Sequence, residues 1–247
     1  MKIGRAMWKS QPVWVEIDSD NIYLLAGDRF AKPKRGDLIA RKDQIKLLAP
    51  IEANNKVVGL FGNYAPRGNR KGPQIFIKPT TAVVGPDDAI VRHKVTPTIN
   101  FEAELGVVIS KTAKNVPITE AMNYVLGYTI TNDVTSFPLF AEDVKLGVRF
   151  KMFDTFCPLG PWIATDVDGQ NLRLTSRLNG EIRQDSSTSK MTFGVAETIA
   201  WISSVLTLRP GDVISMGTPP GNAEMKPGDI ISCEAEGIGV LTNRVTD

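Results

Sequence analysis

The sequence predicts a mixed, mainly β protein with few helices, made of a small β-rich N-terminal domain, residues 1–52, and a larger domain, residues 53–247. Short apolar or β-branched runs recur along the chain between Gly, Pro, Asn and Asp, which is the pattern of short strands joined by turns. The clearest helical spacing of apolar residues is confined to 196–206. A chain of 247 residues can bury a sizeable core.

The composition favours a protein that binds a small molecule. Apolar residues make up 42% of the chain, charged residues 23%, and the formal net charge is +2. Such a small net charge gives no electrostatic footprint for nucleic acid or an anionic membrane. No apolar run reaches bilayer length and no signal-peptide core is present, so we expect a cytoplasmic protein. The two cysteines, Cys157 and Cys233, fit reduced thiols better than a disulfide.

The N-terminal 50 residues alternate short apolar and polar pieces, such as 13–17 and 21–25. Asp, Gly and Pro separate these pieces, so we expect a series of β-hairpins. Residues 48–51 contain a Pro and are expected to connect this unit to the next.

A Gly- and Pro-rich loop, 62–73, follows a short buried strand expected at 57–61. It carries Arg67, Arg70 and Lys71. Such a loop can fold over a pocket and meet an anionic substrate. The alternative, which composition alone favours, is a solvated basic loop.

Two further basic residues, Lys78 and His93, follow this loop in the chain. Lys78 ends the expected strand 74–79, where it either clamps an anion or faces water. His93, the only histidine, is flanked by charged residues and is expected to be exposed. With one histidine, neither a zinc-type ligand set nor a Ser/His triad is easily assembled.

Three carboxylates point to a metal site. Glu102 and Glu104 lie in the apolar run 100–109, and their i, i+2 spacing on a strand directs both side chains to one face. Asp133 follows a second apolar run, 124–130, and can supply a third oxygen ligand. A hard cation, Mg²⁺ or Mn²⁺, suits oxygen ligands. The alternative is three solvated carboxylates at strand ends, which for an isolated Glu-x-Glu is the commoner case.

Two short helices and a lysine among aromatic residues follow in the chain. Thr119 is expected to cap one short helix, and 138–146 is expected to form another that carries Glu142 and Lys145. Lys151 lies between Phe residues, where lost solvation would disfavour its charged form and make it a proton carrier or enolate stabiliser. The alternative is a lysine whose ammonium group reaches water.

The C-terminal part repeats a turn followed by a strand. Asn179-Gly180 is a hairpin signal. The segments 210–215 and 227–232 each read Pro-Gly-Asp before an apolar run, and 35–40 has the same Gly-Asp start. The unequal intervals exclude a solenoid.

Residues 216–222 form a Gly- and Pro-rich turn between those two segments. Free backbone N–H groups in such a turn, as at Gly217, together with the Thr218 hydroxyl, can hold a carboxylate or a phosphate. Turns of this composition are common, so the motif by itself is weak evidence.

Taken together, five motifs resemble the fumarylacetoacetate hydrolase superfamily, and the resemblance covers residues 57 to 245. They are Phe-Glu-Ala-Glu-Leu-Gly from Phe101, Gly-Tyr-Thr-Ile-Thr-Asn-Asp-Val-Thr from Gly127, Arg-Phe-Lys-Met-Phe-Asp-Thr-Phe-Cys-Pro from Arg149, Asn-Gly-Glu from Asn179 and Pro-Gly-Asp-Val-Ile-Ser-Met-Gly-Thr-Pro from Pro210. The resemblance implies a β-roll catalytic domain, an open divalent-metal site and a homodimer.

The resemblance also implies roles for individual residues. It makes Glu102, Glu104 and Asp133 ligands of Mg²⁺ or Mn²⁺. It places Lys151 towards the substrate, Lys78 along the site and Thr218 on a substrate carboxylate. In this chemistry a 2-oxo acid chelates the ion, which stabilises the charge of an enolate.

The chain departs from the hydrolytic members of the superfamily. These carry a His/Glu pair in the lid that activates water, whereas this chain has Pro66-Arg67-Gly68 there. It also has Phe137 and Phe140 where hydrolases commonly have Arg and Gln. Hydrolysis needs an activated water, whereas isomerisation and decarboxylation do not, so the departure favours those two reactions.

The chain therefore resembles most the branch of 2-hydroxyhepta-2,4-diene-1,7-dioate isomerases and the related decarboxylases. An unsaturated 2-oxo dicarboxylic acid from aromatic-compound catabolism would be the substrate. Arg67, Arg70 or Lys71 would meet its distal carboxylate, Lys151 would transfer the proton, and Glu142 would be the substitute base. Two alternatives remain: a C–C hydrolase of acylpyruvates such as fumarylpyruvate, and a non-catalytic relative that binds metal and a dicarboxylate.

Overall fold

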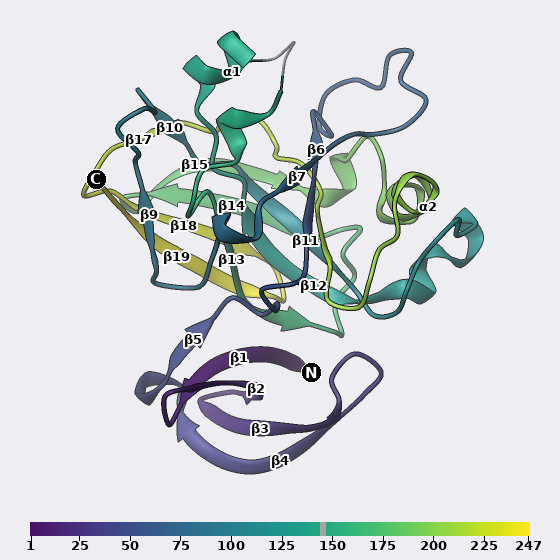
Figure 1. Cartoon of the computed structure of the whole chain (residues 1–247), viewed down its shortest axis with the longest axis vertical. Coiled ribbons are helices and arrows are strands. Elements are labelled where there is room, and N and C mark those ends of the chain that lie inside the picture. Colours follow the sequence, from purple (N-terminus) through teal and green to yellow (C-terminus); the bar gives the residue numbers. More distant parts are fainter. Residues whose placement is uncertain (144–146) are drawn as a thin grey trace.

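Strands dominate the structure, a computed structural model that describes residues 1–143 and 147–247 (Figure 1). The strands are β1 (Lys2–Trp8), β2 (Gln11–Asp18), β3 (Asn21–Asp28), β4 (Lys32–Arg41), β5 (Lys46–Leu48), β6 (Val57–Phe61), β7 (Gln74–Lys78), β8 (Val83–Val84), β9 (Ala89–Val91), β10 (Ile99–Asn100), β11 (Ala103–Ile109), β12 (Val125–Asn132), β13 (Cys157–Ala164), β14 (Arg173–Leu178), β15 (Glu181–Ser187), β16 (Val213–Ser215), β17 (Glu224–Met225), β18 (Ile230–Ala235) and β19 (Gly239–Thr246). The α-helices are α1 (Phe137–Asp143) and α2 (Val195–Val205), and the 3₁₀ helices are η1 (Lys42–Gln44), η2 (Thr80–Ala82), η3 (Ile118–Tyr124), η4 (Arg149–Lys151) and η5 (Thr188–Lys190).

The first four strands form consecutive antiparallel hairpins, as the alternating sequence predicts. Lys9 and Ser10 join β1 to β2 with positive φ angles of 48° and 62°, which match the right-handed twist of the flanking strands. This unit lies at the lower end of Figure 1, and β1 also pairs with β13. The domain boundary after residue 52 stays a prediction.

The prediction of a turn at the start of 35–40 is wrong. Arg35 and Gly36 lie inside β4 and do not form a turn, and Arg35 pairs with Leu25 of β3. The register of this pair shifts nearby, and a side chain at Gly36 would come within 2.9 Å of the Leu24 carbonyl. Glycine therefore allows a close backbone approach at an irregularity of the sheet, a use that the Gly-Asp pair does not distinguish from a turn.

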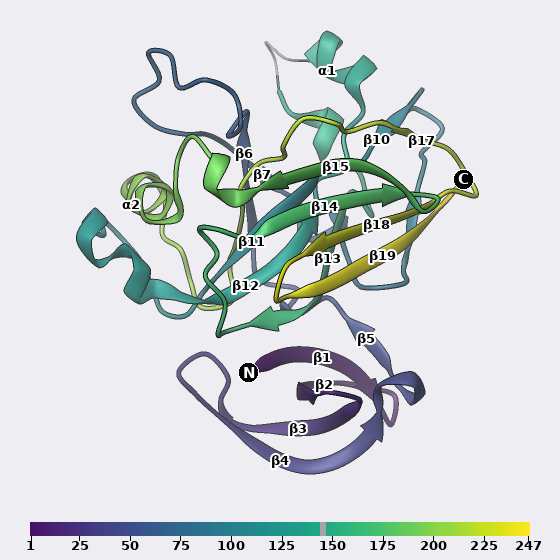
Figure 2. The same cartoon turned by 180° about the vertical axis from the view of Figure 1, so that it is seen from behind.

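Two sheets enclose the core of the remaining chain. One continues from β1 through β13, β12, β11, β16 and β6 to β7. The other has the order β15, β14, β18, β19, β9, and Figure 2 shows its strands β14, β15, β18 and β19 in front of β11, β12 and β13. All seven residues of β11 and all eight of β13 are buried, because these strands are covered on both faces. The fold is thus the mainly β arrangement that the sequence predicts.

The helices are few and short. The helix expected at 196–206 is α2, which packs on η3. Thr119 lies inside η3 and does not cap it, because the chain enters this helix from Pro117. The helix expected at 138–146 is α1, which begins at Phe137; Lys145 lies outside the described residues. None of the described helices is long and apolar enough to cross a membrane.

Candidate active and metal site

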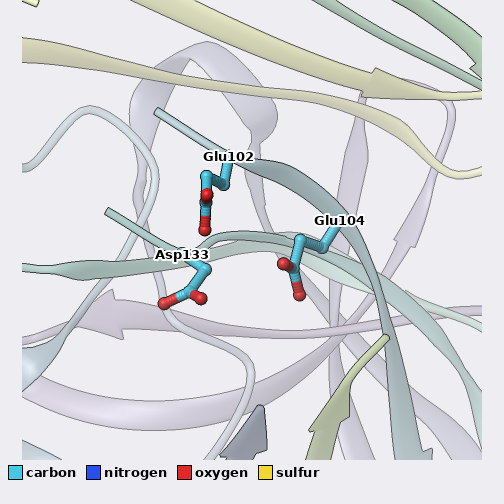
Figure 3. A group of neighbouring side chains, drawn as sticks. All are labelled: Glu102, Glu104 and Asp133. Carbon is cyan, nitrogen blue, oxygen red and sulfur yellow. The ribbon is translucent and has the colours of Figure 1, made fainter. Parts of the chain in front are cut away.

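Three buried carboxylates converge at the start of β11 and the end of β12. Glu102 immediately precedes β11, Glu104 is its second residue, and Asp133 immediately follows β12. Because the two strands are antiparallel, these ends are neighbours, and the Asp133 N–H donates to the Glu102 carbonyl at 2.9 Å. One carboxylate oxygen from each residue lies within 4.8 Å of the others, and Figure 3 shows the three side chains turned towards a common centre. The expectation that Glu102 and Glu104 share a face is confirmed.

Lys151 neutralises part of this charge from η4. Its Nζ lies 2.7 Å from Glu102 Oε2, 2.8 Å from Thr135 Oγ1 and in direct contact with Asp133 Oδ2. The side chain is 5% exposed, so it does not reach water as the alternative interpretation requires. Lys151 therefore belongs to the site.

Lys78 lies on the other side of Asp133. Its Nζ is 2.5 Å from Asp133 Oδ1, and it donates to the backbone carbonyls of Val134 and Phe156 at 3.1 and 2.6 Å. The side chain is buried at the end of β7. In this position Lys78 fixes Asp133 and the backbone around it, and it is not among the residues that line the cavity described below.

Hydrogen bonds orient the two glutamates. Glu104 Oε2 accepts from Ser215 Oγ at 2.5 Å and from the Gly217 N–H at 2.8 Å. Glu102 accepts from Asn222 Nδ2 at 3.1 Å and from Thr135 Oγ1 at 3.1 Å. The segment after β16, which the sequence singles out as a Gly-rich turn, thus supports both carboxylates.

Burial and neighbouring charges shift the pKa values of the site. Burial raises the pKa of Glu104 to about 8, and the negative charges of Asp133 and Glu102 add to the effect. Burial also raises the pKa of Glu102, against the opposing charge of Lys151. For Asp133 burial acts in the same direction, but the ammonium groups of Lys151 and Lys78 outweigh it and lower the pKa.

Lys151 is held in its charged form. Burial opposes that form, but the carboxylates of Asp133, Glu102 and Glu104 outweigh burial and raise the pKa of Lys151. The expectation that lost solvation disfavours its charge is therefore wrong, because the aromatic neighbours in sequence are not its nearest neighbours in space. Lys151 therefore carries its proton when no metal is bound.

The donor set fits a hard divalent cation. Three carboxylates face two ammonium groups, so one negative charge remains without a counter-ion. All three side chains offer oxygen, the ligand that Mg²⁺ and Mn²⁺ prefer. Within the part of the chain that the structure describes, no other group of three His, Cys, Asp or Glu residues meets in this way.

A cavity of about 270 Å³ opens beside the carboxylates. It is lined by Leu60, Phe61, Gly62, Glu102, Glu104, Thr135, Phe137, Phe140, Phe150, Lys151, Thr218 and Asn222. Glu102, Glu104 and Lys151 are the ionisable side chains of this described lining, and four phenylalanines form much of the rest. The cavity thus joins a charged end to an aromatic wall.

Thr218 and Gly217 adjoin the site in different ways. Thr218 lines the cavity, where its hydroxyl donates to the Ala103 carbonyl at 2.9 Å and accepts from Gln184 Nε2 at 2.7 Å. The Gly217 N–H, which the sequence offers to a substrate carboxylate, is used by Glu104. Gly217 thereby positions a predicted metal ligand.

The other predicted residues are not brought into the cavity. Arg67 pairs with Glu197 at 2.7 Å, and Arg70 donates to carbonyl groups of its own loop, such as those of Gly62 and Ala65. Glu142 is exposed on α1 and pairs with Arg149 at 3.1 Å. It is Phe137 and Phe140 of the same helix that line the cavity, so the structure places Glu142 outside the site.

Sequence reasoning missed several supporting residues. Thr135, Ser215 and Asn222 hold the carboxylates, and Asn63 donates to the Met216 carbonyl at 2.8 Å beside Gly217. Thr135 carried a local signal, since it lies two residues after Asp133 at the end of a strand. Ser215 and Asn222 lie in the segments 210–215 and 216–222 that the sequence singles out, but their own types are ordinary for strands and loops.

Comparison with known proteins identifies relatives over most of the chain. The family model described as "Fumarylacetoacetate (FAA) hydrolase C-terminal" matches residues 51–246. Oxaloacetate tautomerase Fahd2a, a mitochondrial protein of Rattus norvegicus, is 38% identical over 220 residues, which are 83% of this chain and 70% of the relative.

Two solved structures are similar over the whole chain. The 2-hydroxyhepta-2,4-diene-1,7-dioate isomerase from Mycobacterium marinum is 38% identical with a TM-score of 0.92, covering 100% of this chain and 98% of the isomerase. Maleylpyruvate hydrolase from Sphingobium sp. SYK-6, solved with manganese(II) and pyruvate, is 26% identical with a TM-score of 0.84, covering 100% and 99%.

Proposed function

Because the chain belongs to the fumarylacetoacetate hydrolase family, we propose that it is a divalent-metal-dependent enzyme that converts a 2-oxo dicarboxylic acid through its enolate. The reaction is isomerisation or tautomerisation, with decarboxylation as a second outcome of the same enolate. One observation carries the proposal: among the described residues that line the cavity, the only ionisable groups are two predicted metal ligands and the ammonium group of Lys151.

That lining favours an enolate reaction over hydrolysis. Hydrolysis needs a base that is free to take a proton from water. Glu102 and Glu104 are committed as ligands in this proposal, and Lys151 is held protonated. The cavity wall near α1 is made of Phe137 and Phe140, which have no proton to exchange. Conversion of an enolate to its oxo acid needs a group that stabilises the enolate charge and a proton donor to carbon 3, and Lys151 would give its proton to that carbon and recover one from water.

Each group of the site has a part in that conversion. Glu102, Glu104 and Asp133 would hold Mg²⁺ or Mn²⁺, which supplies Lewis-acid stabilisation of charge on the oxo oxygen. Lys151 Nζ holds a proton beside the cavity and would exchange it with the substrate. Thr218 would turn its hydroxyl from the Ala103 carbonyl to a substrate carboxylate. The phenylalanines exclude water, which strengthens the electrostatic interactions inside the cavity.

Relatives and cavity size support the substrate class. Two of the three relatives named above act, by their names, on oxaloacetate and on 2-hydroxyhepta-2,4-diene-1,7-dioate, both dicarboxylic acids with an oxo or enol oxygen at carbon 2. The third is named as a hydrolase of maleylpyruvate. A volume of about 270 Å³ is below the roughly 300 Å³ at which pockets for drug-sized ligands begin. A small acid fits that space.

The decisive experiment follows the C3 protons of oxaloacetate by NMR in D₂O with Mg²⁺ or Mn²⁺. We expect the native protein to accelerate exchange over metal alone, and Glu104→Gln to abolish the acceleration. Glu181→Gln is the matched control, since this carboxylate is 74% exposed outside the site. Mg²⁺ and Mn²⁺ are compared in the same assay.

Two results would contradict the proposal. Steady C–C cleavage of fumarylpyruvate without exchange of oxaloacetate would identify a hydrolase. Stabilisation by Mn²⁺ and oxalate without turnover of any 2-oxo acid would identify a binding protein.

A cytoplasmic homodimer also remains our prediction, and light scattering on the purified protein measures its mass in solution.

A further inference from the structure

A second cavity of about 340 Å³ adjoins the site on its aromatic side. Its described lining consists of Phe61, Gln74, Ile75, Phe140, Gly147, Val148 and Phe150. Three of these residues, Phe61, Phe140 and Phe150, also line the cavity that contains the carboxylates. The two cavities therefore adjoin at three phenylalanine side chains.

The three rings come from different elements and lie side by side in the order Phe140, Phe150, Phe61. Phe150 of η4 is buried and lies 5.0 Å from Phe140 of α1, ring centre to ring centre, at 76°. Phe61 at the end of β6 lies 6.1 Å from Phe150 and 4.5 Å from Phe76. Phe140 is half-buried on a helix of seven residues, Phe61 is half-buried as well, and Phe150 is buried.

The two cavities differ in chemistry. The inner one carries Glu102, Glu104 and Lys151. The outer one has, among its described lining, Gln74 as the single polar side chain and no charged one. The inner cavity thus suits the oxo-carboxylate end of an acid, whereas the outer cavity suits an apolar extension of its chain.

We infer that Phe140 sets the length of the 2-oxo acid that the site accepts. Its ring closes the inner cavity against the outer one, so that the native protein selects short acids. Removal of the ring joins the cavities and admits an acid with an apolar tail. This inference rests on the proposed function, because it assumes that the oxo-carboxylate end binds at the carboxylates and Lys151.

The test compares two ligands on the Mn²⁺-loaded protein by calorimetry. Oxalate measures the binding of the oxo-carboxylate end, and 2-oxo-4-phenylbutanoate adds an apolar tail. We expect Phe140→Ala to shift the ratio of their dissociation constants by about tenfold or more in favour of the longer acid, because even one methylene group in an apolar pocket changes binding by about tenfold.

Two further variants keep the result interpretable. Phe140→Leu retains an apolar side chain on α1 and is expected to shift the ratio in the same direction by less, so it replaces Phe140→Ala if that variant does not fold. Phe137→Ala is the matched control, since Phe137 lines only the inner cavity and should leave the ratio as in the native protein.

The outcomes separate this inference from the proposed function. If oxalate binds every variant but the ratio in both Phe140 variants stays within twofold of the native value, Phe140 does not set the length. An equal shift in Phe137→Ala overturns the inference as well, because general loosening would explain it. If the native protein binds neither ligand with Mn²⁺ present, the proposed function fails and the inference fails with it.

Discussion

The ammonium group of Lys151 lies 2.7 Å from the carboxylate of Glu102, and both side chains are buried. Lys151 therefore occupies part of the coordination space of a predicted metal ligand. A cation among the carboxylates and the proton on Lys151 repel each other, so the loading of the site and the charge of Lys151 are coupled.

Metal affinity should rise with pH. In the metal-free protein Glu104 has a pKa of about 8 and is protonated at lower pH, so a binding cation must displace that proton. We expect the affinity for Mn²⁺ to increase by about tenfold per pH unit for this proton between pH 6 and 8 and to level off above pH 8. Calorimetry at several pH values measures the slope. Affinity independent of pH would show that Glu104 is already ionised.

Removal of Lys151 should lower the stability of the metal-free protein and increase the stabilisation that a bound metal ion provides. Lys151→Met leaves Glu102 and Asp133 without one ammonium group, which costs about 3–5 kcal/mol for a buried pair. A cation then binds without competition, so Mn²⁺ should raise the melting temperature of the variant more than that of the native protein. Proton exchange of oxaloacetate should be lost. Native-like exchange in the variant would remove Lys151 from the mechanism.

Lys78 should matter for stability. Lys78→Met leaves the other oxygen of Asp133 and two carbonyl groups without a donor, so we expect a loss of about 3–5 kcal/mol in the free energy of unfolding. Arg173→Met is the control, because Arg173 pairs with Asp185 in an exposed position and should cost less than about 1 kcal/mol. Urea unfolding of the metal-free proteins measures both. If both variants lost the same free energy of unfolding, Lys78 would not be required to hold Asp133.

Gly217 should be required for the position of Glu104. Its φ of +85° disfavours any other residue, and a Cβ there would lie 2.7 Å from the Asn63 Cβ. Gly217→Ala should displace the N–H that donates to Glu104. We expect exchange activity to fall at least tenfold, because a hydrogen bond to a charged group contributes about 1.5–3 kcal/mol.

Gly228→Ala is the matched control for this change. Gly228 has a φ of +96°, but a Cβ there would meet nothing within 4 Å. Both substitutions strain the backbone, by about 1–3 kcal/mol each. The clash with Asn63 adds to the strain only in Gly217→Ala, so we expect a lower melting temperature for this variant than for Gly228→Ala, and an activity loss only in Gly217→Ala at a temperature where both are folded. Equal activities would mean that the N–H of Gly217 is dispensable.

The local sequence was sufficient for most elements of the fold. The hairpin at Asn179-Gly180 joins β14 to β15, and apolar runs gave β6, β7 and α2 within a residue or two. These features depend on neighbours in the chain: alternation, helical spacing and turn residues. The turn expected near Arg35 failed because cross-strand pairing, which the local pattern does not contain, kept this segment in β4.

The sequence by itself determined the chemical parts of the site: carboxylates at i and i+2, a third at a strand end, and a lysine between phenylalanines. Only the tertiary structure decided how they act. Folding places Lys151 against Asp133, which keeps Lys151 charged, and directs the Gly217 N–H to Glu104. It also leaves Glu142 on the surface and brings Phe140 to the cavity. Charge state and orientation depend on groups brought within a few ångströms by folding, and separation along the chain does not specify that distance.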